Sequence, residues 1–253
     1  MLLLSLLPAC SGASEPGSLR LLDWPGRDGR PVALDAPLRL EFDRPLASGL
    51  RRGAWSLSAE DGREARVRAE VAGRFLVLHP ALPCRPDLED AGLAPGRAWR
   101  LELVGLPRLA AVGAADGSIL ERTVRLVFRT AAADDPAALA GSAAGPEELR
   151  LLSLGAAGRN LEVRADGTVV LDLSGPVDPR TLAPAELTPP AGSGPSRQVP
   201  LELIENRRDG SRLRLRVGLW SGWRRLELPD RLEGIGGRPL RPADRRLGLR
   251  GAG

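Results

Sequence analysis

The stretch Leu-Arg-Leu-Glu-Phe-Asp-Arg-Pro-Leu, residues 38 to 46, alternates large apolar side chains with charged ones until it reaches Asp43 and Pro45. Alternation with a period of two is typical of a β-strand that buries one face. Proline ends such a strand because it has no backbone N–H to donate to the sheet. We therefore predict a half-buried strand that runs into a turn at Asp43.

A second stretch repeats this pattern later in the chain. Val169–Pro179 reads Val-Val-Leu-Asp-Leu-Ser-Gly-Pro-Val-Asp-Pro, with leucines in the places of Leu40 and Phe42 at an offset of 131 residues. The segments Trp99–Leu103 and Trp223–Leu228 are also alike, at an offset of 124 residues. Both offsets are about the length of a small domain, and 253 residues are enough for two. The repeat predicts two related β units, each with its own core.

Short alternating runs separated by Pro and Gly predict the remaining strands. In the first unit, Trp55–Leu57 and Val67–Val71 flank Asp61-Gly62 and predict a hairpin, and Phe75–Leu78 predicts a strand buried on both faces. In the second unit, Val199–Ile204 and Leu213–Val217 predict another hairpin. Seven or so strands per unit favour an all-β fold of antiparallel sandwiches.

The basic composition does not indicate a nucleic-acid-binding protein. The formal net charge is +4, but all 36 basic residues are arginine, and they are spread along the chain among 32 acidic residues. A protein that follows a phosphate backbone gathers its basic residues on one surface. The absence of lysine and tyrosine is simply explained by a GC-rich genome, so we expect no nucleic-acid partner.

The N-terminal residues resemble a bacterial lipoprotein signal peptide. Residues 2–7 form a short apolar run, and Leu7-Pro8-Ala9-Cys10 follows it in the place of the lipobox, whose cysteine is acylated before cleavage. The resemblance implies lipidation of Cys10 and a membrane partner reached through that lipid anchor. Residues 11–18 then predict a flexible tether, and no other stretch is long and apolar enough to span a bilayer.

The second cysteine depends on the state of the first. If Cys10 is lipidated, Cys84 is a lone thiol in an oxidising compartment, and we expect it to be buried. If Cys10 carries no lipid, a disulfide between Cys10 and Cys84 becomes the alternative.

Both units resemble the bacterial Ig-like domain of surface-layer proteins and cell-envelope lipoproteins. The family pattern is a strand that ends Phe-x-x-Pro, a central apolar strand that ends in proline, a Trp-led strand, a loop with Asp-Gly or a similar pair, and a final Phe-x-Thr. The matches in the first unit are Phe42, Asp43, Pro45, Leu46, 76–80, 99–103, Asp116-Gly117 and 128–130, and those in the second are 173–178, 213–217, 223–228 and Gly236-Gly237. The resemblance implies two tandem Ig-like antiparallel β-sandwiches at the cell envelope, with a structural, spacing or adhesive function. It implies no catalytic residue.

These observations divide the chain into a signal peptide and tether (1–18), a first sandwich (19–131), a linker (132–148) and a second sandwich (149–253). Residues 131–148 lack strand periodicity and are rich in Ala, Gly and Pro, which is typical of a linker. Within it, Asp134-Asp135 resembles an acidic calcium-binding linker, but two carboxylates supply too few oxygen ligands by themselves.

Few residues are candidates for chemistry. His79 is the only histidine, so a histidine-based metal cage is excluded, and its position at a strand end before Pro80 favours a structural role. Four carboxylates alternate with apolar neighbours and are expected on the outer faces of strands, although spacing alone leaves a glycosidase pair open: Glu41, Glu102, Glu202 and Glu227. We expect no cofactor and no metal site.

Two indoles lie close together in a chain that is otherwise poor in aromatic residues. Trp220 and Trp223 are separated by Ser-Gly, and an indole face can stack on a sugar ring or hold a partner surface. Because Trp223 matches Trp99, we expect it in the core and assign the ligand-binding role to Trp220. The sequence thus predicts a non-catalytic, lipid-anchored envelope protein of the outer membrane or periplasm-facing side. The alternatives are a carbohydrate- or peptide-binding module that uses Trp220, and a hydrolase with an unrecognised carboxylate site.

Overall fold

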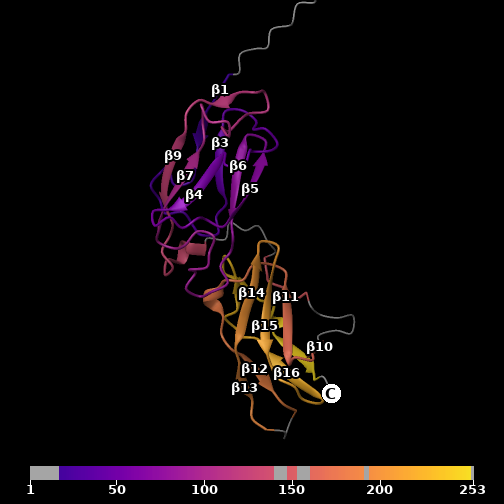
Figure 1. The fold of residues 1–253 in the computed structure, drawn as a ribbon. Helices are drawn as coiled ribbons and strands as arrows, with labels where there is room; N and C mark the ends of the chain where they lie inside the picture. Colours follow the sequence, from indigo (N-terminus) through magenta and orange to yellow (C-terminus); the bar gives the residue numbers. More distant parts are fainter. Residues whose placement is uncertain (1–16, 140–146, 153–159, 191–193, 252–253) are drawn as a thin grey trace, which may run out of the picture.

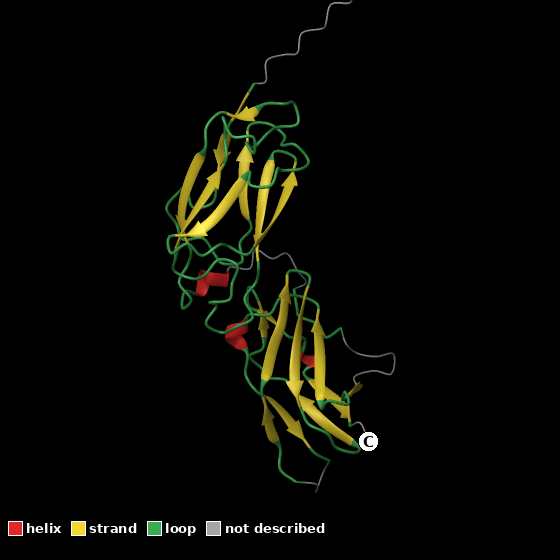
Figure 2. Cartoon of the chain, viewed as in Figure 1, coloured by secondary structure: helices red, strands yellow, loops and turns green. Residues whose placement is uncertain are grey.

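The computed structural model describes residues 17–139, 147–152, 160–190 and 194–251. Its strands form two groups of sheets that follow one another along the length of the molecule (Figure 1). The helical elements in these ranges are three short 3-10 turns: Pro136–Leu139 (η1), Pro179–Thr181 (η2) and Pro242–Asp244 (η3) (Figure 2). The predicted all-β class with antiparallel sheets is confirmed.

The N-terminal half has the strand order of an immunoglobulin constant-type sandwich. Leaving aside two-residue pieces, the first, second, fifth and fourth strands form one sheet, and the third, sixth and seventh form the other. The first sheet is β2-β3-β6-β5: β2 (Leu21–Asp23), β3 (Leu38–Phe42), β6 (Phe75–Pro80) and β5 (Val67–Ala72). The second is β4-β7-β9: β4 (Trp55–Ala59), β7 (Ala98–Leu103) and β9 (Val124–Arg129). A parallel pair, β1 (Ser18–Leu19) and β8 (Ile119–Leu120), lies at the end where the described chain begins.

The C-terminal half repeats this arrangement, except that its opening strand lies in the other sheet and that sheet has one additional strand. A three-stranded sheet has the order β11-β15-β14: β11 (Thr168–Leu173), β15 (Gly210–Arg216) and β14 (Leu201–Arg207). A five-stranded sheet has the order β10-β19-β16-β12-β13: β10 (Asn160–Glu162), β19 (Arg246–Arg250), β16 (Trp223–Glu227), β12 (Ala185–Thr188) and β13 (Arg197–Val199). A small hairpin, β17 (Glu233–Gly234) and β18 (Arg238–Pro239), completes it. Here the opening strand β10 pairs in parallel with the last strand, whereas β2 pairs with β3.

The two stretches that repeat in the sequence occupy equivalent places. β3, the second strand of its half, pairs antiparallel with the fifth strand, β6. β11, also the second strand of its half, pairs antiparallel with β15, which is the sixth because β13 is an additional strand. Leu40 and Phe42 are buried in one hydrophobic cluster, and Leu171 and Leu173 are buried in another. Each half therefore closes over its own apolar interior, as alternation of the side chains predicts.

The turn at Asp61-Gly62 forms a short hairpin, because Ala59 N donates to the Arg63 carbonyl at 2.8 Å and Ser58 lies opposite Glu64 in an antiparallel bridge. The predicted second limb, Val67–Val71, does not pair with β4, and that part of the prediction is wrong. β4 pairs with β7, and the chain crosses after the turn to the opposite sheet, where β5 pairs with β6. A tight turn shows that the chain reverses direction, and the partner of each limb is chosen by the sheet that buries it. The hairpin of β14 and β15 is confirmed, with Arg207 opposite Gly210.

Two strand predictions need correction: one strand is buried on a single face, and another is divided into two. In β6, only Leu76 and Leu78 of the apolar run are buried, and the Arg39 guanidinium covers the Phe75 ring at 3.6 Å from its centroid. The predicted strand at 199–204 is divided at Pro200, where the chain passes from β13 in one sheet to β14 in the other. Proline suits this crossing because the residue leaves the hydrogen-bonding ladder there.

A third apolar cluster lies where the two halves meet. It contains residues from the N-terminal half, from η1 and from the loop after β16: Leu34, Leu82, Leu88, Ala91, Ala131, Ala138, Leu139 and Ile235. Residues 132–139 of the predicted linker thus contribute buried side chains, and Leu34 N donates to the Ala138 carbonyl at 2.9 Å. Residues 140–146 lie outside the described residues, and the predicted domain boundaries stay predictions.

Candidate functional site

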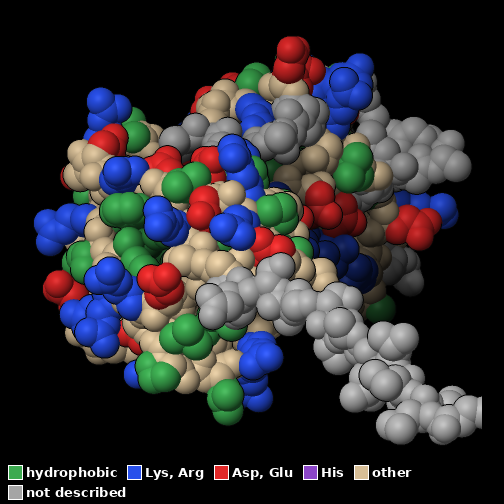
Figure 3. Space-filling view, turned by 90° about the horizontal axis from the view of Figure 1, so that it is seen from above, with side chains coloured by type: hydrophobic (Ala, Val, Ile, Leu, Met, Phe, Trp, Pro, Cys, Tyr) green, Lys and Arg blue, Asp and Glu red, His purple; other side chains and the backbone are tan. Residues whose placement is uncertain are grey.

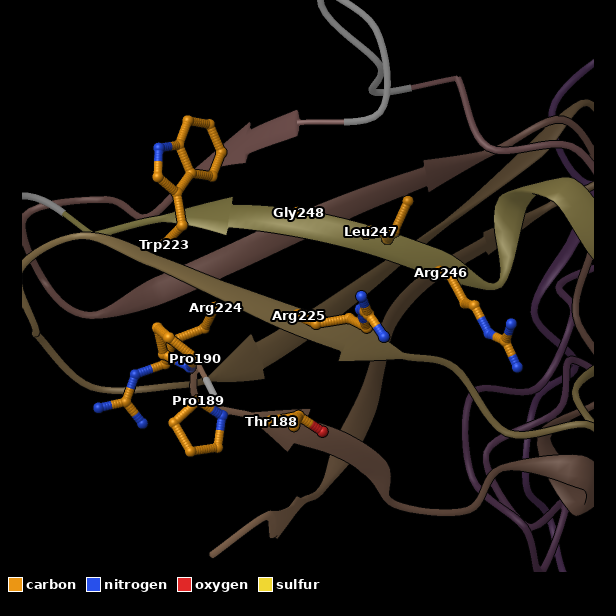
Figure 4. A pocket seen from close by; sticks show the side chains of 9 residues that line it. All are labelled: Thr188, Pro189, Pro190, Trp223, Arg224, Arg225, Arg246, Leu247 and Gly248. Carbon is orange, nitrogen blue, oxygen red and sulfur yellow. The ribbon is translucent and has the colours of Figure 1, made fainter. Parts of the chain in front are cut away.

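A hollow of about 540 Å³ lies on the five-stranded sheet of the C-terminal half. Its lining comes from the end of β12 and from β16 and β19: Thr188, Pro189, Pro190, Trp223, Arg224, Arg225, Arg246, Leu247 and Gly248 (Figure 4). In the register of the sheet, Arg225 is paired with Thr188 on one side and with Gly248 on the other. Because Gly248 has no side chain, the sheet is hollowed beside Arg225.

Trp223 is accessible in this hollow, which contradicts its expected place in the core. The Trp223 side chain is 46 % exposed, whereas Trp99 is fully buried. The buried pair Leu101–Leu126 of β7 and β9 corresponds to the buried pair Leu226–Leu247 of β16 and β19. The two Trp-led strands are therefore equivalent at an offset of 125 residues (226 − 101), one more than the 124 that the sequence indicated. A shift of one residue moves a side chain to the other face of a strand.

Trp220, the predicted ligand-binding residue, lies beside the hollow and is partly buried. It packs against the core of the C-terminal half, and the Arg224 guanidinium lies 4.9 Å from its ring centroid. Its Nε1–H donates to the Gly222 carbonyl at 3.2 Å. Arg224 takes the register position that Trp99 has in the other half, so the Trp220 indole covers the core there. A ligand-binding role for Trp220 stays a prediction.

The charges of the hollow are unevenly paired. Arg246 forms an ion pair with Glu227 at 3.1 Å, and Arg224 stacks on Trp220. Within the described ranges, the Arg225 guanidinium has no carboxylate partner. A guanidinium and an exposed indole on one side of a sheet can bind a flat or cyclic ligand that carries a negative charge, because each offers a planar face and the guanidinium offers paired N–H donors.

His79 lies at the junction of the halves and not in this hollow. Together with Arg68 and Arg208, it lines a second, larger depression between β5, β6 and the β14–β15 turn. Its Nε2 is 3.4 Å from Glu70, and its Nδ1 is buried without a hydrogen-bond partner within the described structure. Burial, and then the nearby Arg208 charge, lower the pKa of His79. These contacts support the structural role that was predicted from its position.

Each of the four carboxylates considered for catalysis is held by an arginine. Glu41 pairs with Arg74, Glu102 with Arg125, Glu202 with Arg214 and Glu227 with Arg246, at 2.7 to 3.1 Å. All four lie on outer faces, as predicted, and they belong to four different strands in four different sheets.

Cys84 is half-buried and packs against the core of the C-terminal half, which raises the pKa of its thiol. Cys10 lies outside the described residues, so its lipidation and the alternative disulfide stay predictions. Across the described ranges, no three His, Cys, Asp or Glu side chains gather as metal ligands would, which includes the surroundings of Asp135. No helix in these ranges is long and apolar enough to cross a bilayer.

Comparison with known proteins leaves the family open. No family model matches the chain, and no curated protein matches it. A crystal structure of native alpha-2-macroglobulin from Escherichia coli, spanning domains MG0-NIE-MG1, is 13 % identical over 92 % of this chain and 71 % of that chain, with a TM-score of 0.41. A cryo-EM structure of the native E. coli protein is 12 % identical over 93 % of this chain and 14 % of that chain, with a TM-score of 0.42. The FN1–FN3 domains of chicken CNTN1 are 10 % identical over 94 % and 65 %, with a TM-score of 0.23.

Proposed function

We propose that this chain is a non-catalytic cell-envelope lipoprotein whose Ig-like modules act as a structural, spacing or adhesive surface. Cys10 is its lipid attachment site, the membrane is its first partner, and an envelope protein or polysaccharide is its second. The observation that carries the proposal is the junction between the halves. A spacer must hold its two ends at a fixed distance, and this junction has the contacts of a fixed joint.

Three side chains of the C-terminal half donate to carbonyl groups of the N-terminal half or of the linker segment that follows it. Arg180 forms an ion pair with Asp178 at 2.8 Å and donates a hydrogen bond to the Asp135 carbonyl at 3.1 Å. Asn206 donates to the Pro83 carbonyl at 2.7 Å, and Arg208 donates to the Asp35 carbonyl at 2.7 Å.

These bonds surround the third apolar cluster, so polar and apolar contacts restrain the same joint. Buried hydrogen bonds resist rotation because a donor or acceptor that is left unpaired costs about 1–3 kcal/mol. Relative motion of the halves is the default where an interface is small and polar, and the apolar cluster works against it.

The absence of catalysis is supported by the pairing of the candidate acids. A glycosidase needs two carboxyl groups that face one bond, at about 5–10 Å from each other. Glu41, Glu102, Glu202 and Glu227 lie on four different strands, and each is paired with an arginine instead. This pairing suits a charged, soluble outer face.

Mass spectrometry of the membrane fraction tests the lipid anchor. We expect the mature N-terminal peptide to begin at an acylated Cys10, and Cys10→Ala to release the protein into the soluble fraction. A mature chain with an unmodified Cys10, or an unprocessed residue 1, would contradict the proposal. Small-angle scattering of the purified chain tests the spacer, which predicts one elongated particle with a single set of dimensions.

A second candidate function is a carbohydrate- or peptide-binding module, and the exposed Trp223 favours it. The hollow beside Arg225 offers an indole and a free guanidinium on one face, which suits an acidic sugar. Retention on cell-wall polysaccharide separates the candidates. If the module binds through this hollow, Trp223→Ala abolishes retention while Leu219→Ala, which also removes an exposed side chain, leaves it unchanged.

A further inference from the structure

The end of the N-terminal half that faces away from the junction has no role in the proposed function. β3, β5 and β7 all run toward it, so the loops that follow them meet there: residues 43–54, 73–74 and 104–123. We name these loops, together with residues 17–20, the N-terminal tip. β1 pairs with β8 of the longest loop, so the described chain begins within the tip itself.

The equivalent end of the C-terminal half is covered. Its loops follow β11, β14 and β16, and they carry Arg180, the Asn206–Arg208 segment and Ile235, all of which contact the N-terminal half or the third cluster. The halves are thus stacked head to tail. The stacking covers this loop end in the C-terminal half and leaves the equivalent loop end of the N-terminal half exposed. In the loop after β16, Ile235 is fully buried, whereas in the loop after β7 Leu106 and Leu109 are 47 % and 87 % exposed.

The exposed leucines are held in place by a rigid loop. The Leu106 N–H donates to the Leu120 carbonyl at 2.9 Å, and Arg51 donates to the Leu109 carbonyl from the neighbouring loop. At Gly105 the two limbs of the loop pass so closely that an added Cβ would lie 2.2 Å from the Arg122 carbonyl carbon. These contacts restrain the backbone of the loop, and Leu109 is 87 % exposed on it.

The tip carries more basic than acidic side chains, and Arg51 and Arg108 line the same hollow as these leucines. Three of its arginines are in ion pairs: Arg44 with Asp116, Arg74 with Glu41 and Arg108 with Glu102. The tip contains seven arginines and three acidic residues: Arg20, Arg44, Arg51, Arg52, Arg74, Arg108 and Arg122, with Asp43, Asp116 and Glu121. Figure 3 looks down on this end and shows hydrophobic side chains among both basic and acidic ones. Exposed apolar side chains with basic neighbours are the combination that binds the interface of an anionic bilayer, because the apolar groups enter the headgroup region and the arginines are attracted to its negative charge.

We propose that the N-terminal tip is a membrane-contact surface, in which Leu106 and Leu109 enter the headgroup region of a bilayer that contains anionic phospholipid. This inference rests on the proposed anchoring at Cys10 for its geometry. From Cys10 to Gly17 the chain can reach about 25 Å at most, so a lipid at Cys10 keeps the tip beside the bilayer. At such a short distance, a weak contact is strengthened by its high effective concentration.

Vesicle sedimentation of the unlipidated chain tests the contact without the anchor. The protein is residues 10–253 with Cys10→Ser, which retains every described residue, and the vesicles are phosphatidylcholine alone or with phosphatidylglycerol. We expect binding to the anionic vesicles that weakens as salt is added, and little binding to phosphatidylcholine alone. The double variant Leu106→Ser, Leu109→Ser should lose at least about tenfold in affinity, and Arg51→Glu at least about fivefold.

Matched variants on the other half control for nonspecific effects. Leu219→Ser removes a leucine that is 62 % exposed, and Arg216→Glu reverses an exposed arginine of β15, and neither should change vesicle binding. Equal loss in tip variants and controls, or no binding to anionic vesicles, would overturn the proposal, and the second result would favour a protein partner at the tip. Acylation of Cys10 is measured separately. An acylated Cys10 with a tip that does not bind contradicts only this inference, and an unmodified Cys10 with a tip that binds contradicts only the proposed anchor.

Discussion

The joint between the halves depends on Asn206, and Asn206→Ala is the sharpest test of a fixed spacer. The Asn206 amide donates to the Pro83 carbonyl at 2.7 Å and to the Val177 carbonyl at 2.9 Å, and its oxygen accepts from the Val177 N–H at 3.0 Å. Alanine removes all three bonds and leaves buried groups on both sides of the junction without partners. At about 1–3 kcal/mol for an unpaired buried group, we expect a loss of roughly 2–4 kcal/mol in the free energy of unfolding.

Urea unfolding measures that loss, and small-angle scattering measures the joint. We expect Asn206→Ala to lower the unfolding midpoint and to broaden the distribution of particle dimensions, since one of the three bonds joins the halves. Ser211→Ala is the matched control because it removes a buried bond, from Ser211 Oγ to the Gly175 carbonyl at 2.9 Å, that lies within the C-terminal half. The control should lose about 1 kcal/mol and keep the parental scattering curve. A cost below about 0.5 kcal/mol for Asn206→Ala, with unchanged scattering, would refute the reasoning.

Three further predictions follow from single side chains. Burial and the Arg208 charge lower the pKa of His79 below 6.5, so the unfolded chain binds more protons than the folded one; stability should be highest above pH 6.5 and fall as the pH drops below it, and His79→Gln should flatten this part of a urea-unfolding pH profile. Hydrogen bonds from Ser118 and Arg44 lower the pKa of Asp116 from 3.8 to about 2, so its stabilisation should be present above pH 3.8 and be lost toward pH 2, and Asp116→Asn should remove that acid-dependent part of the thermal stability. Gly105→Ala should destabilise the tip loop, because the added Cβ would meet the opposite limb of the loop, and a thermal scan together with the vesicle assay measures the effect. Gly49→Ala is the control: its Cβ would meet nothing within 4 Å, so both measurements should be unchanged.

The local pattern of the chain was sufficient to predict strands and the faces that they bury. In β3 and β11, leucine and phenylalanine at every second position are all buried, because side chains of a strand alternate between its two faces whatever the partner strand is. The same local rule identified the β14–β15 hairpin, where both limbs and the turn lie in one continuous stretch. The outer-face position of the four glutamates followed from it as well.

Pairing between strands that lie far apart in sequence was not predictable in the same way. The runs Trp55–Leu57 and Val67–Val71 alternate like the two limbs of a hairpin, yet β4 pairs with residues 63–65 and with β7, whereas β5 lies in the opposite sheet beside β6. Trp223 was predicted in the core because the two sequences were aligned on their tryptophans, which is an alignment error of one residue. The register is fixed by the cross-strand pair of Leu226 with Leu247. With this register Trp223, and not Trp220 as predicted, is the more accessible of the two indoles.

The sequence by itself determined that the chain is all-β, that it contains two similar units, and which leucines face their interiors, because each of these depends on alternation within a few neighbouring residues. Only the tertiary structure decided how the units are joined. The junction depends on an asparagine, two arginines and a set of loop residues that share no periodicity and that come together only when both sandwiches have formed. The same stacking decided that one loop end is buried and the other is exposed, so the tip could be recognised as a surface only after the halves were in place.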